Sequence, residues 1–220
     1  MKINQTGRSM VEMLGVLAII GVLSAGGLAG YNKAMTQHKL NKHMDEINYL
    51  LATAIYNNDK LKDASTYMIP EMQALKAFTW NVIFDEDDIH FYDSLQTQVW
   101  FEHNSATGAT AFSVRLPESE FSVKVCHNYI NIFKNFTDDI DLVSVLKAFE
   151  RDDNGHTRQR NVYIGKGCTS GKCLATMTNT DIINLCHDSC SGSYACMLYA
   201  HFGYPAEAIA NLLAGDGVAY

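Results

Sequence analysis

The pattern of hydrophobic and polar positions begins with a long apolar stretch. Between Met10 and Tyr31 the only charged residue is Glu12, and between Met13 and Gly30 the only polar side chain is that of Ser24. At 1.5 Å per residue a helix over this stretch is about 33 Å long, which matches the roughly 30 Å hydrocarbon core of a bilayer. The pattern therefore predicts a helix long enough to cross a membrane.

Beyond this stretch the apolar residues continue on one helical face. They recur at spacings of four and three, at Leu40, Met44, Ile47, Leu51 and Ala54, as they do along one side of an amphipathic helix. The polar cluster Asn57-Asn58-Asp59 is typical of a helix end. We therefore predict one continuous helix from about residue 9 to residue 57. The chain then divides into a helical segment over residues 8–58 and a globular head over residues 59–220.

The head has the mixed pattern of an α+β domain. Apolar and polar residues alternate in short segments, which predicts four strands, at residues 98–102, 111–116, 161–165 and 174–178. In the second of these, Phe112, Val114 and Leu116 are expected on the buried face and Ser113 and Arg115 on the other. A spacing near 3.6 residues predicts a helix after Pro117, carrying Phe121, Val125, Tyr129 and Phe136. We expect a four-stranded antiparallel sheet packed on the amphipathic half of the long helix.

Composition narrows the class of protein. Of the 220 residues, 47% are hydrophobic and 19% are charged, which is enough apolar content for a core and excludes a disordered chain. A mean hydropathy of −0.09 excludes a polytopic membrane protein. The net charge of −7 argues against a nucleic-acid partner.

All six cysteines lie in the second half of the chain, at Cys126, Cys168, Cys173, Cys186, Cys190 and Cys196. An even number in a domain outside the cytoplasm favours disulfides. Cys168 and Cys173 can close a small loop, and Cys126 is expected to pair with a distant partner; the remaining connectivity stays open. A zinc site is the alternative, with thiolates from Cys168, Cys173, Cys186 and Cys190 and His187 or His201 as a substitute ligand.

The sequence contains no pattern typical of an enzyme. The G-x-S-x-G, H-E-x-x-H, Walker A and dinucleotide glycine motifs are all missing from it. Cys126 precedes His127, and Cys186 precedes His187, but adjacent helical residues point about 100° apart and form no dyad by themselves. Acidic clusters at residues 85–88 and 138–141 lack EF-hand spacing, so turns or helix caps are favoured over calcium. We predict no catalytic residue, no metal and no cofactor.

Glu12 needs a partner, because a carboxylate in an apolar helix costs several kcal/mol unless it is paired, neutralised or left at the interface. Arg8 lies one turn earlier and can form an i, i+4 pair with it. The second interpretation is that the positive partner comes from another subunit. In a low-dielectric helix bundle such a pair would set the axial register, since a wrong register leaves a buried charge unpaired.

One segment of the chain resembles a known family, and it reads Gly7-Arg8-Ser9-Met10-Val11-Glu12. Followed by an uninterrupted apolar helix, it is similar to the class III signal of type IV pilins and pseudopilins. In that family a prepilin peptidase cuts after the glycine, the new N-terminal amine is usually methylated, and a glutamate at the fifth mature position faces the amine of a neighbouring subunit. The family usually has an apolar residue directly after the cut, whereas this chain has Arg8.

The resemblance implies a set of roles and partners. Residues 1–7 would be the leader, the cut would fall between Gly7 and Arg8, and Glu12 would be the assembly carboxylate. The fold would be pilin-like, and the chain would sit in the inner membrane before joining an extracellular or periplasmic filament. Implied partners are copies of the chain, the prepilin peptidase and the inner-membrane assembly platform with its ATPase. Such subunits serve adhesion, motility, DNA uptake or protein secretion.

Two other interpretations of the apolar stretch remain. The first is a plain anchor, which would make the chain a bitopic inner-membrane protein with a periplasmic head that binds a ligand or partner. The second is a signal peptide cut near residues 25–30, which would release a secreted disulfide-rich domain. Within the filament interpretation, a pilin or minor pilin is favoured over a type II secretion pseudopilin by the size of the head and its late cysteines.

Overall fold

The computed structural model describes residues 10–61, 69–85, 89–104, 108–117, 119, 121–147, 159–191, 196–205, 207 and 209. The chain divides into two compact units, Met1–Asn41 and Lys42–Tyr220.

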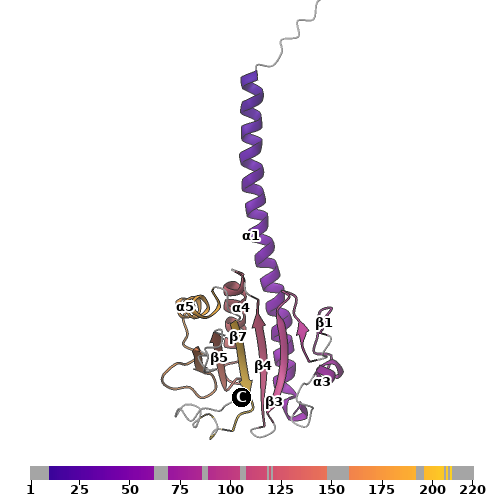
Figure 1. The fold of residues 1–220 in the computed structure, drawn as a ribbon, viewed down its shortest axis with the longest axis vertical. Helices are drawn as coiled ribbons and strands as arrows, with labels where there is room; N and C mark the ends of the chain where they lie inside the picture. The colour runs from indigo at the N-terminus through magenta and orange to yellow at the C-terminus, as the bar shows by residue number, and fades with distance from the viewer. Residues whose placement is uncertain are drawn as a thin grey trace, which may run out of the picture. The chain divides into compact units, whose positions relative to one another are not determined.

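The first unit consists of the beginning of helix α1 (Met10–Tyr56), drawn in indigo in Figure 1. The predicted helix over residues 9–57 is confirmed to within one residue at each end. Every residue from Glu12 to Met35 is exposed, so helix formation in this part rests on local backbone bonding and on the surroundings of the helix. Long aliphatic side chains such as Leu14, Leu17 and Leu23 favour it.

The second unit is built on a seven-stranded antiparallel sheet with the order β1-β2-β3-β4-β7-β5-β6. Its strands are β1 (Ile83–Phe84), β2 (Phe91–Tyr92), β3 (Gln98–Asn104), β4 (Ala109–Leu116), β5 (Leu142–Lys147), β6 (Gln159–Ile164) and β7 (Cys196–Phe202). The last strand in the sequence, β7, lies between β4 and β5. Val114 of β4 is thereby paired with Val99 on one side and Leu198 on the other.

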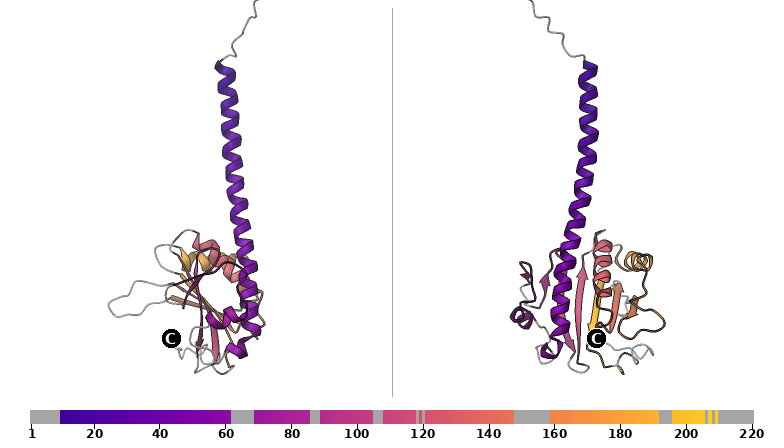
Figure 2. Two further views of the ribbon diagram at one scale, coloured as in Figure 1. Left: turned by 90° about the vertical axis from the view of Figure 1, so that its right-hand side faces the viewer. Right: turned by 180° about the vertical axis from the view of Figure 1, so that it is seen from behind.

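The described part of this unit also contains the helices α2 (Asn58–Leu61), α3 (Ile69–Ala74), α4 (Ser122–Lys134) and α5 (Asn179–Cys190). Helix α4 and the Lys42–Tyr56 part of α1 contribute to one core with the sheet, and Figure 2 (right) shows both in front of the strands. Leu51 of α1, Phe133 of α4 and Phe112 of β4 are all fully buried in this core. The predicted apolar face of α1 is confirmed, since Ile47, Leu51 and Ala54 are buried in it.

Two expectations for the sheet were wrong. The sheet has seven strands rather than four, because β7 and β5 lie between β4 and β6 and two short strands, β1 and β2, extend the opposite edge. Residues 174–178 are not a strand, and their neighbourhood joins the sheet only through a bridge between Ile164 and Cys173. They lead into α5, where the Thr178 hydroxyl accepts from the Asp181 amide and the Asp181 carboxylate accepts from the Thr178 amide. This capping box starts a helix.

Strand β4 is covered more completely than its alternation predicts. Phe112, Val114 and Leu116 are buried as expected, and Arg115 is exposed. Ser113, however, is fully buried on the opposite face. Its neighbours in the register are Trp100 of β3 and Tyr199 of β7, whose rings meet edge to face. Large side chains on the flanking strands therefore cover a small polar residue on the central one.

Candidate functional site

The first unit exposes the apolar part of α1, a surface that is expected to contact lipid or another protein. Between Met13 and Leu28 its large side chains are exposed on every side of the helix, from Ile20 at 53% to Val22 at 74%. Among the residues that the structure describes, this is the one helix long and apolar enough to cross a membrane. Exposed apolar surface of this extent marks contact with lipid or with another protein.

Glu12 lies in the first turn of this helix and its side chain is exposed. A carboxylate in the first turn is favoured by the partial positive charge of the helix N-terminus. Gly7 and Arg8, the residues of the expected processing site, lie outside the described residues. The structure therefore places the candidate assembly carboxylate on the helix and leaves its partner open.

Small residues gather on one face of the same helix. Gly15, Gly26 and Gly30 share this face because their spacings of eleven and four come close to whole numbers of turns, and Ala25 and Ala29 adjoin it. A Cβ atom added at any of these three glycines would meet no atom within 4 Å. These glycines are therefore not required by packing within the chain, and their face leaves room for the close approach of another helix.

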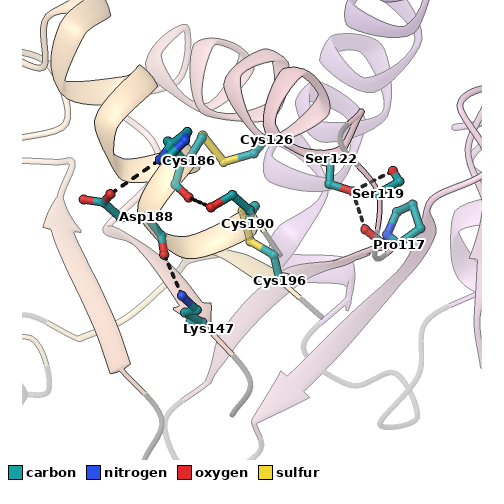
Figure 3. Close-up of a disulfide and its surroundings, with 11 residues drawn as sticks. Pro117, Ser119, Ser122, Cys126, Lys147, Cys186, Asp188, Cys190 and Cys196 are labelled. Carbon is teal, nitrogen blue, oxygen red and sulfur yellow. Dashed lines mark hydrogen bonds and ion pairs between the residues drawn. A yellow bond between two sulfur atoms is a disulfide. The ribbon is translucent and has the colours of Figure 1, made fainter. Parts of the chain in front are cut away.

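Three disulfides join the elements of the head. Figure 3 shows Cys126 of α4 bonded to Cys186 of α5, and Cys190 at the end of α5 bonded to Cys196 at the start of β7. The third bond joins Cys168 to Cys173. The expectations of a small loop closed by Cys168 and Cys173 and of a distant partner for Cys126 are both confirmed. Helix α5 is thus held to α4 at its middle and to the sheet at its end.

The zinc alternative and the cysteine nucleophiles are wrong for the same reason. Cys168, Cys173, Cys186 and Cys190, the four proposed thiolates, are all oxidised and belong to three separate disulfides. A sulfur in a disulfide is neither a metal ligand nor a nucleophile of the thiolate type. The described residues contain no group of three or more His, Cys, Asp or Glu side chains placed to hold a metal ion.

A buried polar network, which the sequence did not reveal, joins α1 to α4 and to the turn after β2. Nε2 of His43 lies 2.8 Å from Oδ2 of Asp93, and the Asn128 amide nitrogen lies 2.8 Å from Nδ1 of His43. The hydroxyls of Tyr129 and Thr97 donate to the same carboxylate oxygen. The backbone amides of Leu95 and Thr97 donate to the other oxygen, Oδ1.

The environment of Asp93 keeps it ionised. Burial alone would raise its pKa, but the hydrogen bond and charge of His43, with the hydroxyls of Thr97 and Tyr129, bring the pKa below its ordinary value. Burial and the nearby Asp93 carboxylate raise the pKa of Tyr129 well above its ordinary value, so its hydroxyl stays a donor. His43, Asp93 and Tyr129 are at most 1% exposed. The hydrogen bonds of this buried histidine–aspartate pair link α1, α4 and the turn after β2.

The expected acidic clusters also serve local structure where they are described. Asp141 is buried, and its Oδ2 accepts a 2.7 Å hydrogen bond from the backbone amide of Tyr204. Burial raises the pKa of Asp141, although the hydrogen bond from Tyr204 and the charge of Lys166 oppose the shift. The second cluster, at residues 85–88, lies outside the described residues except for Asp85.

No family model matches the chain, and no curated protein and no solved structure matches it. The features that bear on function are therefore the exposed apolar helix and the disulfide-bonded head.

Proposed function

We propose that the chain is a non-enzymatic structural subunit, a pilin or minor pilin of a type IV pilus-like filament. The observation that carries the proposal is the exposed apolar part of α1 with a single carboxylate, Glu12, in its first turn. A helix of this kind has two stable surroundings, the bilayer and a bundle of like helices. In the proposed function the helix lies in the bilayer before assembly and in the helix bundle of the filament afterwards.

In the proposed mechanism a prepilin peptidase cuts after Gly7 and makes the amine of Arg8 the new N-terminus. The Glu12 carboxylate of one subunit then pairs with that amine of a neighbouring subunit. Inside a bundle of apolar helices an unpaired carboxylate costs several kcal/mol. Because only one axial register pairs each carboxylate with an amine, the pair selects how subunits stack.

The face of small residues on α1 supports helix–helix association. Gly15, Gly26 and Gly30 each weaken the helix by about 0.5–1 kcal/mol relative to alanine, and packing within the chain does not explain them. Small residues allow helix backbones to approach closely when helices associate. A filament core supplies that second helix, whereas a solitary anchor gains nothing from this face.

The disulfides of the head support its proposed place on the filament surface, outside the cytoplasm. Three disulfides tie α4, α5 and β7 to one another and close the Cys168–Cys173 loop. Disulfides persist in oxidising compartments outside the cytoplasm. A head stabilised in this way suits the outer surface of a filament, where no chaperone or reducing agent repairs it.

The test is to replace Glu12 by glutamine or alanine in cells that carry a type IV pilus system. We expect the Glu12→Gln and Glu12→Ala subunits to insert into the membrane and accumulate at normal levels, while filament assembly is lost. The matched control is Asp45→Asn, because Asp45 is an exposed carboxylate farther along the same helix. Sheared surface filaments and membrane fractions are compared by immunoblotting. Normal filaments from Glu12→Gln subunits would contradict the proposed pairing.

A bitopic membrane protein with a periplasmic binding head is the second candidate. It is favoured by a polar groove between α5 and β6, lined by Asn161 and Asn184 among others. This candidate predicts that the chain keeps its original N-terminus and that replacing Glu12 has no effect on its function.

A further inference from the structure

A groove on the head lies between α5, β6 and the loop that the Cys168–Cys173 disulfide closes. Its volume is about 420 Å³, within the 300–1,000 Å³ range of small-molecule sites. Most of the residues around it are polar, in contrast to the apolar lining of most such sites. The polar side chains of the lining include those of Asn161, Tyr163, Lys172, Asp181, Asn184 and Asp188.

Each wall of the groove follows from the local fold. Asp181, Asn184 and Asp188 share one face of α5 because they lie three and four residues apart, and Asp188 is labelled in Figure 3. Asp181 and Asp188 are therefore separated by about 10 Å along the helix axis. Asn161 and Tyr163 are two residues apart on β6, so they point to the same side of the strand.

The disulfide loop forms the third wall and positions Lys172. The Lys172 carbonyl accepts a 2.8 Å hydrogen bond from the Ile164 amide, and the Leu174 amide donates to the Ile164 carbonyl at 2.8 Å. These bonds fasten the loop to the end of β6. The Lys172 ammonium lies 3.4 Å from Oδ1 of Asn161 and 5.6 Å from the centre of the Tyr163 ring. The small disulfide thus contributes directly to the shape of the groove.

The lining offers donors and acceptors side by side. The Lys172 ammonium and the Tyr163 hydroxyl donate, the Asp181 and Asp188 carboxylates accept, and the Asn184 amide does both. Burial, with a contribution from the Asp181 charge, raises the pKa of Tyr163, which keeps its hydroxyl protonated at neutral pH. Two further ammoniums adjoin the lining, because Lys134 donates to the Met177 carbonyl and Lys147 to the Asp188 carbonyl. The two carboxylates and the three ammoniums nearly balance, so the charges of the groove favour neither an anionic ligand nor a metal cation.

We infer that this groove binds a neutral sugar. A sugar presents several hydroxyls that each donate and accept, and it carries no charge, which suits a lining of mixed polarity. The length of the α5 wall accommodates more than one sugar ring. The inference goes beyond the proposed filament and does not depend on it, because all of the residues belong to the head of a single chain.

The test is saturation-transfer difference NMR on the full chain in lauryldimethylamine oxide, a detergent without a sugar headgroup. The probes are lactose, cellobiose, maltose and chitobiose, with sialyllactose as the anionic counterpart of lactose. We expect at least one neutral disaccharide to bind saturably, and sialyllactose to bind no more tightly than that sugar. The Asn184→Ala variant should bind the same sugar about tenfold more weakly, the factor for one lost hydrogen bond.

The matched control is Asn179→Ala, because Asn179 is an exposed asparagine on the same helix that does not line the groove. Asn184 is also exposed, so both variants should fold, and near-ultraviolet circular dichroism checks this. A second variant, Tyr163→Phe, removes only a hydroxyl. The inference is wrong if none of the four neutral sugars binds, if sialyllactose binds more tightly than every neutral sugar, or if Asn184→Ala and Asn179→Ala bind alike.

Discussion

At the scale of single residues, Asp93 shows how a buried charge holds the head together. Its carboxylate accepts from His43 of α1, from Tyr129 of α4 and from backbone amides of its own turn. Removing one member of a buried ionic network leaves the other members without partners, which costs more than the lost bond itself. The network therefore couples the amphipathic end of α1 to the head.

This coupling predicts a specific dependence of stability on pH. The folded-state pKa of Asp93 lies below its ordinary value of about 3.9, so folding favours the ionised form. The stability that Asp93 contributes is complete above about pH 4 and is lost as the pH falls through the folded-state pKa. We expect Asp93→Asn to lower the free energy of unfolding by about 3 kcal/mol at pH 7 and to lose less stability on acidification than the unaltered chain.

Urea unfolding of the detergent-solubilised chain at pH 7 and pH 3, followed by tryptophan fluorescence, measures both effects. The control is Asp45→Asn, an exposed carboxylate on α1, which should change stability by less than about 0.5 kcal/mol. Equal losses on acidification in the unaltered chain and in Asp93→Asn would show that Asp93 does not carry the dependence.

At the scale of elements, the disulfides differ in the length of chain that they close. Cys126–Cys186 spans 60 residues and Cys168–Cys173 spans 5. In the chain-entropy account a longer closed loop stabilises more, which gives about 4 kcal/mol for the first bond and about 2 kcal/mol for the second. The first bond also lies in the core, since both of its cysteines are fully buried.

We therefore expect the double variant Cys126→Ala, Cys186→Ala to be destabilised by about 4 kcal/mol, roughly twice the effect of Cys168→Ala, Cys173→Ala. Urea midpoints of both variants under non-reducing conditions make the comparison. The small-loop variant is the matched control, because it also removes two sulfurs from the head. Equal destabilisation by the two variants would contradict the loop-length argument.

The elements differ in how well the sequence predicts them. Helix α1 was predicted nearly to its ends, because its apolar run and its single apolar stripe are both long. Strands β3 and β4 were predicted from alternation. Helix α5 was missed because its sequence is largely polar and its start depends on the Thr178–Asp181 capping box. Strand β7 was missed because its central place in the sheet depends on β4 and β5 rather than on its own residues.

The residues of the candidate site also differ in how well the sequence predicts them. Glu12 and the cysteines stand out in the sequence as a charge in an apolar run and as an even set of thiols. The pairing of Cys186 with Cys126 rather than with Cys190 or Cys196 requires α5 to pack beside α4, which local pattern does not encode. His43, Asp93 and Tyr129 are far apart in the sequence and carry no shared motif, so only the fold brings them together.

At the scale of the whole molecule, two units of different character share one chain. The first presents apolar surface and one carboxylate, and the second is a folded, disulfide-bonded domain with its own core. In the proposed function the first unit supplies assembly and the second supplies the surface that meets the surroundings. The proposed sugar site gives that surface a ligand to recognise.

The most direct measurement of the central claim is the intact mass and N-terminal residue of the membrane-extracted chain, expressed with and without a prepilin peptidase. The proposed function predicts a chain that begins at Arg8 only when the peptidase is present, with residues 1–7 removed. A chain that begins at Met1 in both cases would contradict it and favour the plain anchor. A chain that begins beyond residue 25 would identify a secreted domain and would remove the role proposed for Glu12.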